Sequence, residues 1–329
     1  MRFYILLLLI FFLVSASITL AQDDDDIINV DTSIVRINVG VVTRSGQPIK
    51  SLNKNDFLLY EDGVKQKILR FEPTVAPFSV AMILDMSGST LGFRQTIKIS
   101  ATRFIDALAP DDRVSVIEFY DKVKVLNDFS SKRKTLYHSI SAANGRGKTQ
   151  LYKALDISLK NLAKEKNRRK AIIVLTDGID TVTRNQDRSI LSKLEDSEMK
   201  NAINPEKNEI FTDILNKADA QGVTIYPLAL PTGDPSKLAD PLPIQIAMYS
   251  AARSRLNILA NRTGGTLNAI NRLEELGKFY AQAAADVRSL YTIEYESSND
   301  KRDGKWRKIK IEVKNPELIS RTRPGYFAK

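Results

Sequence analysis

The chain has 329 residues, with 49 Lys and Arg against 39 Asp and Glu, one histidine and no cysteine. The absence of cysteine excludes disulfides, thiol nucleophiles and Cys-ligated metal sites, and a single histidine excludes a His-rich metal site. Chemistry based on oxygen ligands remains open. Ten Lys and Arg against three Asp and Glu fall within residues 301–329, so this tail carries most of the formal charge of +10.

The N-terminal segment, residues 1–21, joins Met1-Arg2 to a long apolar run that ends in small residues at Thr19 and Ala21. This pattern predicts a secretory signal peptide. An uncleaved N-terminal anchor is the alternative, since about 20 apolar residues can span a bilayer. The small residues favour cleavage. Either interpretation predicts an exported protein, located in the periplasm, at the cell surface or outside the cell.

Residues 22–75 are predicted to form a small β module. Within it, residues 35–41 alternate apolar and polar side chains, the period of a half-buried strand. The segments 57–60 and 64–71 flank an Asp62-Gly63 turn, which is typical of a β-hairpin.

Residues 76–289 alternate between buried-strand and helix patterns, which predicts an α/β domain with a doubly wound, mainly parallel, Rossmann-like sheet. Continuous apolar runs typical of parallel strands lie at 79–84, 114–117, 171–175 and 223–230, and helical spacing of apolar residues lies at 97–108, 151–162 and 273–287. A charged stretch, 184–208, and a proline-rich stretch, 231–243, interrupt this alternation. We expect both to be loops at the sheet rim where such folds bind ligands.

The last region, residues 290–329, returns to β patterning. Segments 290–295 and 306–313 alternate apolar and polar residues on either side of a polar loop that ends in Asp303-Gly304. We expect a β-hairpin followed by a basic tail. The pattern leaves open whether the β regions at the two ends of the chain form one domain.

Three oxygen-bearing residues follow the first buried strand of the α/β region, in the order Asp85, Ser87 and Ser89. A strand-end carboxylate lies at the carboxyl edge of a parallel sheet, where ligands of these folds bind. A helix cap is the alternative reading, since Asp and Ser also favour that role. An aspartyl-phosphate enzyme also starts from a strand-end Asp, but it needs a second Asp at the position that Ser87 occupies.

Two further donors are expected at the same edge. Asp177 follows another buried strand in a Thr-Asp-Gly turn, and Thr149 stands between a flexible Gly-containing loop and a predicted helix. Carboxylates and hydroxyls are hard oxygen ligands, which suit Mg²⁺ or Mn²⁺ better than zinc or copper. Asp177 and Thr149 together favour a metal site over a helix cap.

These motifs resemble the von Willebrand factor type A family, in which they form a metal-ion-dependent adhesion site. The resemblance rests on Asp-x-Ser-x-Ser, on a Thr before Leu-Tyr-x-Ala-Leu and on Thr-Asp-Gly, and it covers about residues 76–289. It implies five metal ligands: Asp85, Ser87, Ser89, Thr149 and Asp177. The whole mature chain also resembles exported bacterial VWFA-related proteins, described chiefly from Acidobacteria, through Asp56-Phe57, Glu61-Asp62-Gly63 and the segment Arg323-Pro-Gly-Tyr-Phe327.

The resemblance implies a non-catalytic protein that binds the carboxylate of a partner protein through the metal, in adhesion or in the cell envelope. Two alternatives stay open: a metal-dependent hydrolase, against which the lack of an accompanying general base counts, and an envelope assembly factor. Nucleic acid is not an expected partner of an exported protein. The basic tail fits a solvated strand face, and contact with an anionic envelope surface is a weaker hypothesis.

Overall fold

The computed structural model describes residues 34–45, 47–73, 77–166 and 168–328. The predicted signal peptide, residues 1–21, lies outside the described residues. No helix within the described ranges is long and apolar enough to cross a membrane.

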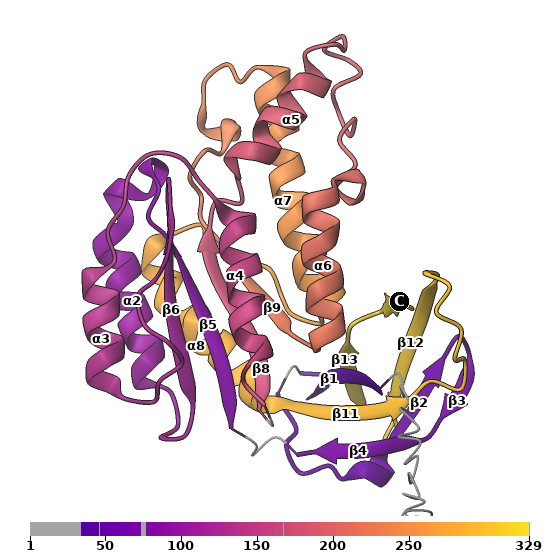
Figure 1. The fold of residues 1–329 in the computed structure, drawn as a ribbon. Coiled ribbons are helices and arrows are strands. Elements are labelled where there is room, and N and C mark those ends of the chain that lie inside the picture. The colour runs from indigo at the N-terminus through magenta and orange to yellow at the C-terminus, as the bar shows by residue number, and fades with distance from the viewer. Residues whose placement is uncertain (1–33, 46, 74–76, 167, 329) are drawn as a thin grey trace, which may run out of the picture. The chain divides into compact units, whose positions relative to one another are not determined.

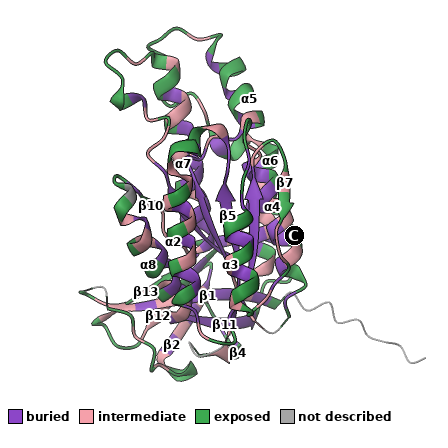
Figure 2. Ribbon diagram, turned by 90° about the vertical axis from the view of Figure 1, so that its left-hand side faces the viewer, coloured by how far each residue is buried: buried purple, intermediate pink, exposed green. Residues whose placement is uncertain are grey.

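The predicted α/β fold is confirmed: its centre is a six-stranded sheet with the strand order β10-β9-β8-β5-β6-β7. Every neighbouring pair is parallel except β6–β7, which is antiparallel. The strands are β5 (Phe78–Asp85), β6 (Arg113–Phe119), β7 (Val123–Val125), β8 (Arg169–Thr176), β9 (Thr224–Ala229) and β10 (Asn268–Ala269). Strands β5 and β9 are buried at every residue, and Figure 2 shows β5 buried in the middle of the domain.

Helices cover both faces of this sheet (Figure 1). They are α2 (Arg94–Asp106), α3 (Arg133–Ala142), α4 (Leu151–Ala163), α5 (Thr181–Leu191), α6 (Glu209–Gln221), α7 (Pro243–Thr263) and α8 (Leu276–Ser289). Alternate residues of β5 serve the two faces. Val80, Met82 and Leu84 pack with α2, α3 and α8, while Ala81 and Ile83 pack with α4, α6 and α7.

Part of the predicted loop rim is helical. Helix α5 includes the start of the charged stretch 184–208, and α7 begins at the end of the proline-rich stretch 231–243. The sequence patterns also missed α6 and α7. In α7 the buried face consists largely of alanines together with Arg255 and Arg262, so the helix lacks the stripe of large apolar residues that identifies an amphipathic helix.

The two ends of the chain build two antiparallel four-stranded sheets together, in the orders β13-β1-β11-β4 and β14-β12-β2-β3. The strands are β1 (Ile34–Thr43), β2 (Phe57–Glu61), β3 (Val64–Gln66), β4 (Ile68–Glu72), β11 (Leu290–Glu296), β12 (Trp306–Val313), β13 (Leu318–Thr322) and β14 (Gly325–Phe327). Their side chains form a common core that includes Ile37, Tyr291 and Ile311. The region boundaries at 75 and 289 remain predictions, but strands from both ends share each sheet.

The predicted C-terminal hairpin is wrong. β11 pairs with β1 and β4, whereas β12 pairs with β2 and β14. The polar loop between β11 and β12 is long enough to pass from one sheet to the other, and each strand finds its apolar partners in the N-terminal segment. The expected basic tail also forms strands, β13 and β14. By contrast, the predicted turn between β2 and β3 is present, with positive φ angles at Asp62 (48°) and Gly63 (84°).

This β region contacts the amino ends of the central strands. The Asn38 side chain donates to the carbonyl oxygen of Gly222 (2.9 Å) and to the hydroxyl of Thr224 (3.0 Å), the first residue of β9. The carboxyl ends of the same strands lie at the opposite edge of the sheet. The β region therefore does not cover this carboxyl edge.

Candidate metal centre

Two neighbouring strands bring the predicted carboxylates together. Asp85 is the last residue of β5, and Asp177 follows the last residue of β8, Thr176. The strands are parallel, with Leu84 opposite Leu175, so both end at the same edge. The Thr176 hydroxyl donates to Asp85 Oδ2 at 2.9 Å and ties the two strand ends together.

A chain of hydrogen bonds through Ser87 and Ser89 joins the two carboxylates. The backbone N–H of Ser87 donates to Asp85 Oδ1 (2.9 Å), and the hydroxyls of Ser87 and Ser89 lie 3.2 Å apart. Ser89 in turn donates to Asp177 Oδ2 at 3.0 Å. Four of the five predicted ligands therefore belong to one connected hydrogen-bond network.

The helix-cap alternative fails for Ser87. Ser87 precedes a short 3₁₀ helix, Gly88–Phe93, but its side chain makes no capping hydrogen bond. The Ser87 hydroxyl contacts Ser89 instead, so it faces the carboxylate pair.

The fifth predicted ligand, Thr149, lies on a third loop at the same edge. Gly88 N–H donates to the carbonyl oxygen of Gly147 at 3.1 Å, which places the loop before α4 against the turn after β5. The Thr149 N–H donates to the hydroxyl of Thr181, and its carbonyl accepts from Thr181 N–H, both at 3.0 Å. Within the described residues, no hydrogen bond joins the Thr149 side chain to the other four predicted ligands. Thr149 is thus near the network and half-exposed, but not part of it.

The two carboxylates lie in the interior of the domain. Asp85 is 0% exposed and Asp177 is 3% exposed. Burial raises the pKa of Asp85 to about 7, with a further contribution from the negative charge of Asp177, despite hydrogen bonds from Ser87 and Thr176 that lower the pKa. Neither carboxylate has an ion pair with any described Lys, Arg or His. A pair of like charges in this position is stabilised by a bound cation.

The donor set fits a hard divalent cation. It combines two carboxylates with neutral hydroxyl oxygens, and Mg²⁺ and Mn²⁺ prefer such ligands. Over the described ranges there is no cluster of three or more Asp, Glu or His side chains suited to a metal. The hydroxyl groups are therefore needed to complete a ligand set here.

Two residues at the site had no predicted role. Thr176 binds Asp85, as described above, and Thr232 donates to Asp177 Oδ2 at 3.2 Å. Thr176 belongs to the Thr-Asp-Gly motif, so its strand-end position was a usable signal. Thr232 lies in the proline-rich stretch after β9, and only the pairing of β8 with β9 brings it to Asp177.

The sole histidine of the chain, His138, lies on α3 and is exposed. No hydrogen bond within the described part of the chain connects it to the carboxylate network. The structure therefore gives it no link to the proposed site.

The chain thus contains a doubly wound α/β domain whose sheet has an acidic and hydroxyl-rich carboxyl edge, the edge at which domains of this class bind ligands when they do so. Residues 80–179, which run from β5 to the turn after β8, match the family model described as von Willebrand factor type A domain.

Other comparisons give more distant similarities. An uncharacterized protein of Synechocystis sp. is 33% identical over 106 residues, which cover 31% of this chain and only about a quarter (25%) of that protein. The vWF domain of the type V pili tip protein Mfa5 from Porphyromonas gingivalis is 14% identical, with a TM-score of 0.46, over 64% of this chain and 94% of that chain. A von Willebrand factor type A structure from Catenulispora acidiphila is 12% identical, with a TM-score of 0.48, over 84% of this chain and 65% of that chain.

Proposed function

We propose that this protein is an exported, non-catalytic binding protein that engages an acidic residue of a partner protein through a divalent cation, Mg²⁺ or Mn²⁺. The proposed ligands are Asp85, Ser87, Ser89, Thr149 and Asp177. One observation carries the proposal: two buried carboxylates, Asp85 and Asp177, have no ion pair with any described cationic side chain and share one hydrogen-bond network through Ser87 and Ser89 at the carboxyl edge of the sheet.

The proposed ligands differ in how deeply they are buried. Asp85 and Ser87 are buried and anchor the base of the site, whereas Ser89 is exposed and Thr149 is half-exposed. The solvent side therefore offers neutral hydroxyls and the protein side offers charge. A bound divalent cation would supply a Lewis-acidic position that accepts a carboxylate from outside. The partner would approach from the side of Ser89 and Thr149.

The location of the partner is inferred from residues 1–21, whose pattern is that of a signal peptide. An exported protein meets its partner in the envelope or outside the cell. Adhesion and envelope assembly both fit this placement, and both use the same site.

The first test is metal binding by the full chain. Calorimetric titration with Mn²⁺ and Mg²⁺ should show one site, which is lost in Asp85→Ala and kept in Asp300→Ala, a control in an exposed loop. Pull-downs from envelope extract, with Mg²⁺ or with chelator, then test the partner. Partner binding that survives both chelation and Asp85→Ala would sink the proposal. Metal-dependent turnover of phosphate or peptide substrates, lost in Asp85→Ala, would replace it with a hydrolase.

A further inference from the structure

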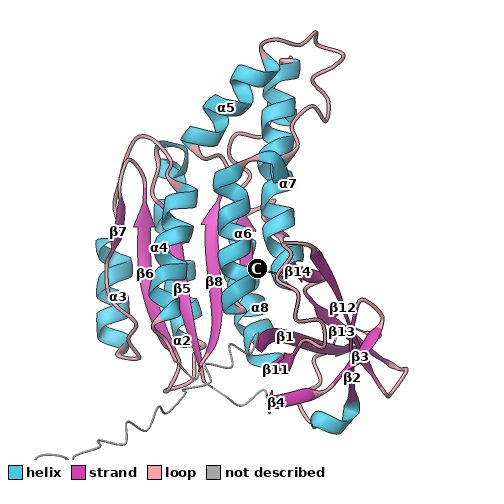
Figure 3. Ribbon diagram, turned by 45° about the vertical axis from the view of Figure 1, so that its right-hand side comes forward, coloured by secondary structure: helices cyan, strands magenta, loops and turns pink. Residues whose placement is uncertain are grey.

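A cleft of about 590 Å³ opens beside the proposed metal site, between α4, the first turn of α5 and α6. These three elements lie together in Figure 3, with α5 above α4 and α6. Thr149 lines the cleft and is also a proposed metal ligand. The cleft and the metal site therefore share a wall, and one bound segment can reach both.

The walls of the cleft carry apolar side chains that are open to solvent. Val182 on α5 is 52% exposed and Ile210 on α6 is 41% exposed, and both line the cleft. Ile214 and Tyr152, which are buried, line it below them. Burying apolar surface favours association, so these walls favour an apolar occupant.

The charges around the cleft are unevenly distributed. Further along α4 and α6, Lys217 pairs with Asp156 (2.7 Å) and with Asp213 (2.6 Å). The charges at the end of the cleft far from Thr149 are therefore paired with one another. Beside Thr149, Lys148 and Lys153 are exposed and have no ion pair with any described residue. Asp180 also lines the cleft and the Lys148 N–H donates to Asp121, so the positive charge beside Thr149 is confined to the exposed ammonium groups of Lys148 and Lys153, which complement an acidic residue of a bound segment.

We propose that this cleft takes a large apolar side chain from the same acidic partner segment whose carboxylate meets the metal. This inference rests on the proposed function and specifies its ligand. The segment would carry an acidic residue and, close to it in sequence, a Leu-sized side chain, because the two sites share Thr149. Additional acidic residues would face Lys148 and Lys153.

The test is selection of random dodecapeptides displayed on phage against the immobilised full chain in Mg²⁺. We expect the enriched peptides to share an acidic residue and a large apolar residue at fixed spacing. Replacing that apolar residue by Ala in a synthetic peptide should weaken binding about tenfold or more. When the immobilised target is Ile210→Gln or Val182→Asn, the enriched peptides should no longer share the apolar residue but should still share the acidic one.

The matched control is Ile99→Gln on α2, where Ile99 is 44% exposed and does not line the cleft. This variant should select the same peptides as the unmodified chain. Thermal melts of all variants establish that each is folded.

Each outcome separates the cleft from the metal site. An acidic consensus without an apolar position, or one unchanged in Ile210→Gln, overturns the cleft and leaves the proposed function intact. An apolar consensus that resists chelator and is lost in Ile210→Gln supports the cleft and overturns the metal-based function. Selection that enriches no consensus overturns both.

Discussion

At the scale of single residues, the site concentrates negative charge where water is excluded. The Asp85 and Asp177 carboxylates are linked through Ser87 and Ser89, and neither forms an ion pair with a described cationic side chain. Isolated buried charges are costly, so folded proteins normally pair them or use them to coordinate metals. The remaining lone pairs of these carboxylates are therefore the chemical reason to expect a cation.

Metal binding should appear as added stability. A ligand that binds only the folded state, present at a concentration about 100 times its Kd, stabilises that state by about 2.7 kcal/mol. We expect Mg²⁺ to raise the Tm of the full chain, chelator to reverse the rise, and Asp85→Asn to abolish it. Asp300→Asn, in an exposed loop, should respond like the unmodified protein. Equal Mg²⁺ responses of the two variants in differential scanning fluorimetry would contradict the assignment.

Gly178 fixes the turn that presents Asp177. Its φ is +87°, and a Cβ there would lie 2.8 Å from Leu256 Cδ1 and 3.3 Å from the carbonyl oxygen of Ala252. The left-handed conformation alone costs a non-glycine residue roughly 1–2 kcal/mol. Gly178→Ala should therefore destabilise the fold by about 2 kcal/mol or more and weaken metal binding.

The matched control is Gly63→Ala. Gly63 has φ +84°, but a Cβ there meets nothing within 4 Å, so only the conformational cost applies. In urea unfolding, Gly178→Ala should lower the free energy of unfolding more than Gly63→Ala does. Equal losses would mean that the contact with Leu256 relaxes freely.

At the scale of elements, α5 matters because it borders both the metal site and the cleft. A buried, bidentate ion pair holds it to α7: Arg255 donates to both oxygens of Asp187, at 2.6 and 2.7 Å, with exposures of 3% and 5%. A small apolar cluster that includes Leu191, Met199 and Ala247 packs beyond it. These contacts explain why a segment rich in charged residues is ordered as a helix.

Removing one partner of this pair leaves the other charge buried. We expect Arg255→Met to cost about 3–5 kcal/mol in urea unfolding. The pair Arg44–Glu317 has a comparable distance (3.2 Å), but its side chains are 68% and 67% exposed. Arg44→Met should therefore change stability by no more than about 0.5 kcal/mol. Similar effects of the two substitutions would refute the assignment of α5 anchoring to Arg255.

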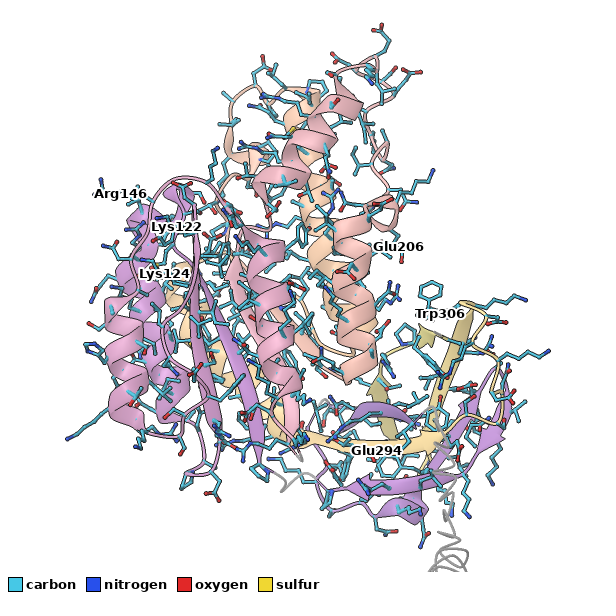
Figure 4. The ribbon with its side chains drawn as sticks, viewed as in Figure 1. Lys122, Lys124, Arg146, Glu206, Glu294 and Trp306 are labelled. Carbon is cyan, nitrogen blue, oxygen red and sulfur yellow. The ribbon has the colours of Figure 1, made fainter. Side chains whose placement is uncertain are left out.

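At the scale of the whole described chain, Arg262 on α7 joins the α/β domain to the C-terminal strands. Its guanidinium lies 4.8 Å from the ring centres of both Trp306 and Phe327 and pairs with Asp219 at 2.9 Å. Asp219 is also 3.7 Å from Arg323. Figure 4 shows Trp306 on the side of the β region that faces the helices.

Because these contacts bridge the two regions, we expect calorimetry to show one cooperative unfolding transition. Arg262→Ala should lower the stability of that whole transition by about 3 kcal/mol, since Asp219 loses a buried partner. Two resolved transitions in the unmodified chain would show that the α/β and β regions fold independently.

In the folded chain, some of the basic residues of the C-terminal tail make internal contacts. Arg307 pairs with Asp303 at 3.0 Å, and Arg323 donates to the carbonyl oxygen of Asp219 and to that of Arg36, so two of its charges serve internal contacts. Lys308 remains exposed. Contact with an anionic surface stays a proposal for the exposed lysines alone, and salt-sensitive binding to anionic vesicles would test it.

Local patterns in the sequence were sufficient for the α/β class. The buried run before Asp85 and the one before Asp177 each define a parallel strand, and a strand-end residue lies at the carboxyl edge whatever the rest of the chain does. The same logic predicted the metal-site residues as candidates, because three motifs on three loops converge on one edge. Whether they bind a metal stays a prediction.

Only the tertiary structure showed the features that depend on contacts between residues far apart in the sequence. It separated β11 from β12, because strands pair with whichever segment completes their apolar face, and here that segment is N-terminal. It brought Thr232 to Asp177 through the order of strands in the sheet, which no local pattern encodes. It also revealed α7, whose buried Arg255 and Arg262 have their partners on α5 and α6. A composition with one His and no Cys left oxygen ligands as the expected chemistry, whereas the arrangement of the oxygen-bearing side chains required the folded chain.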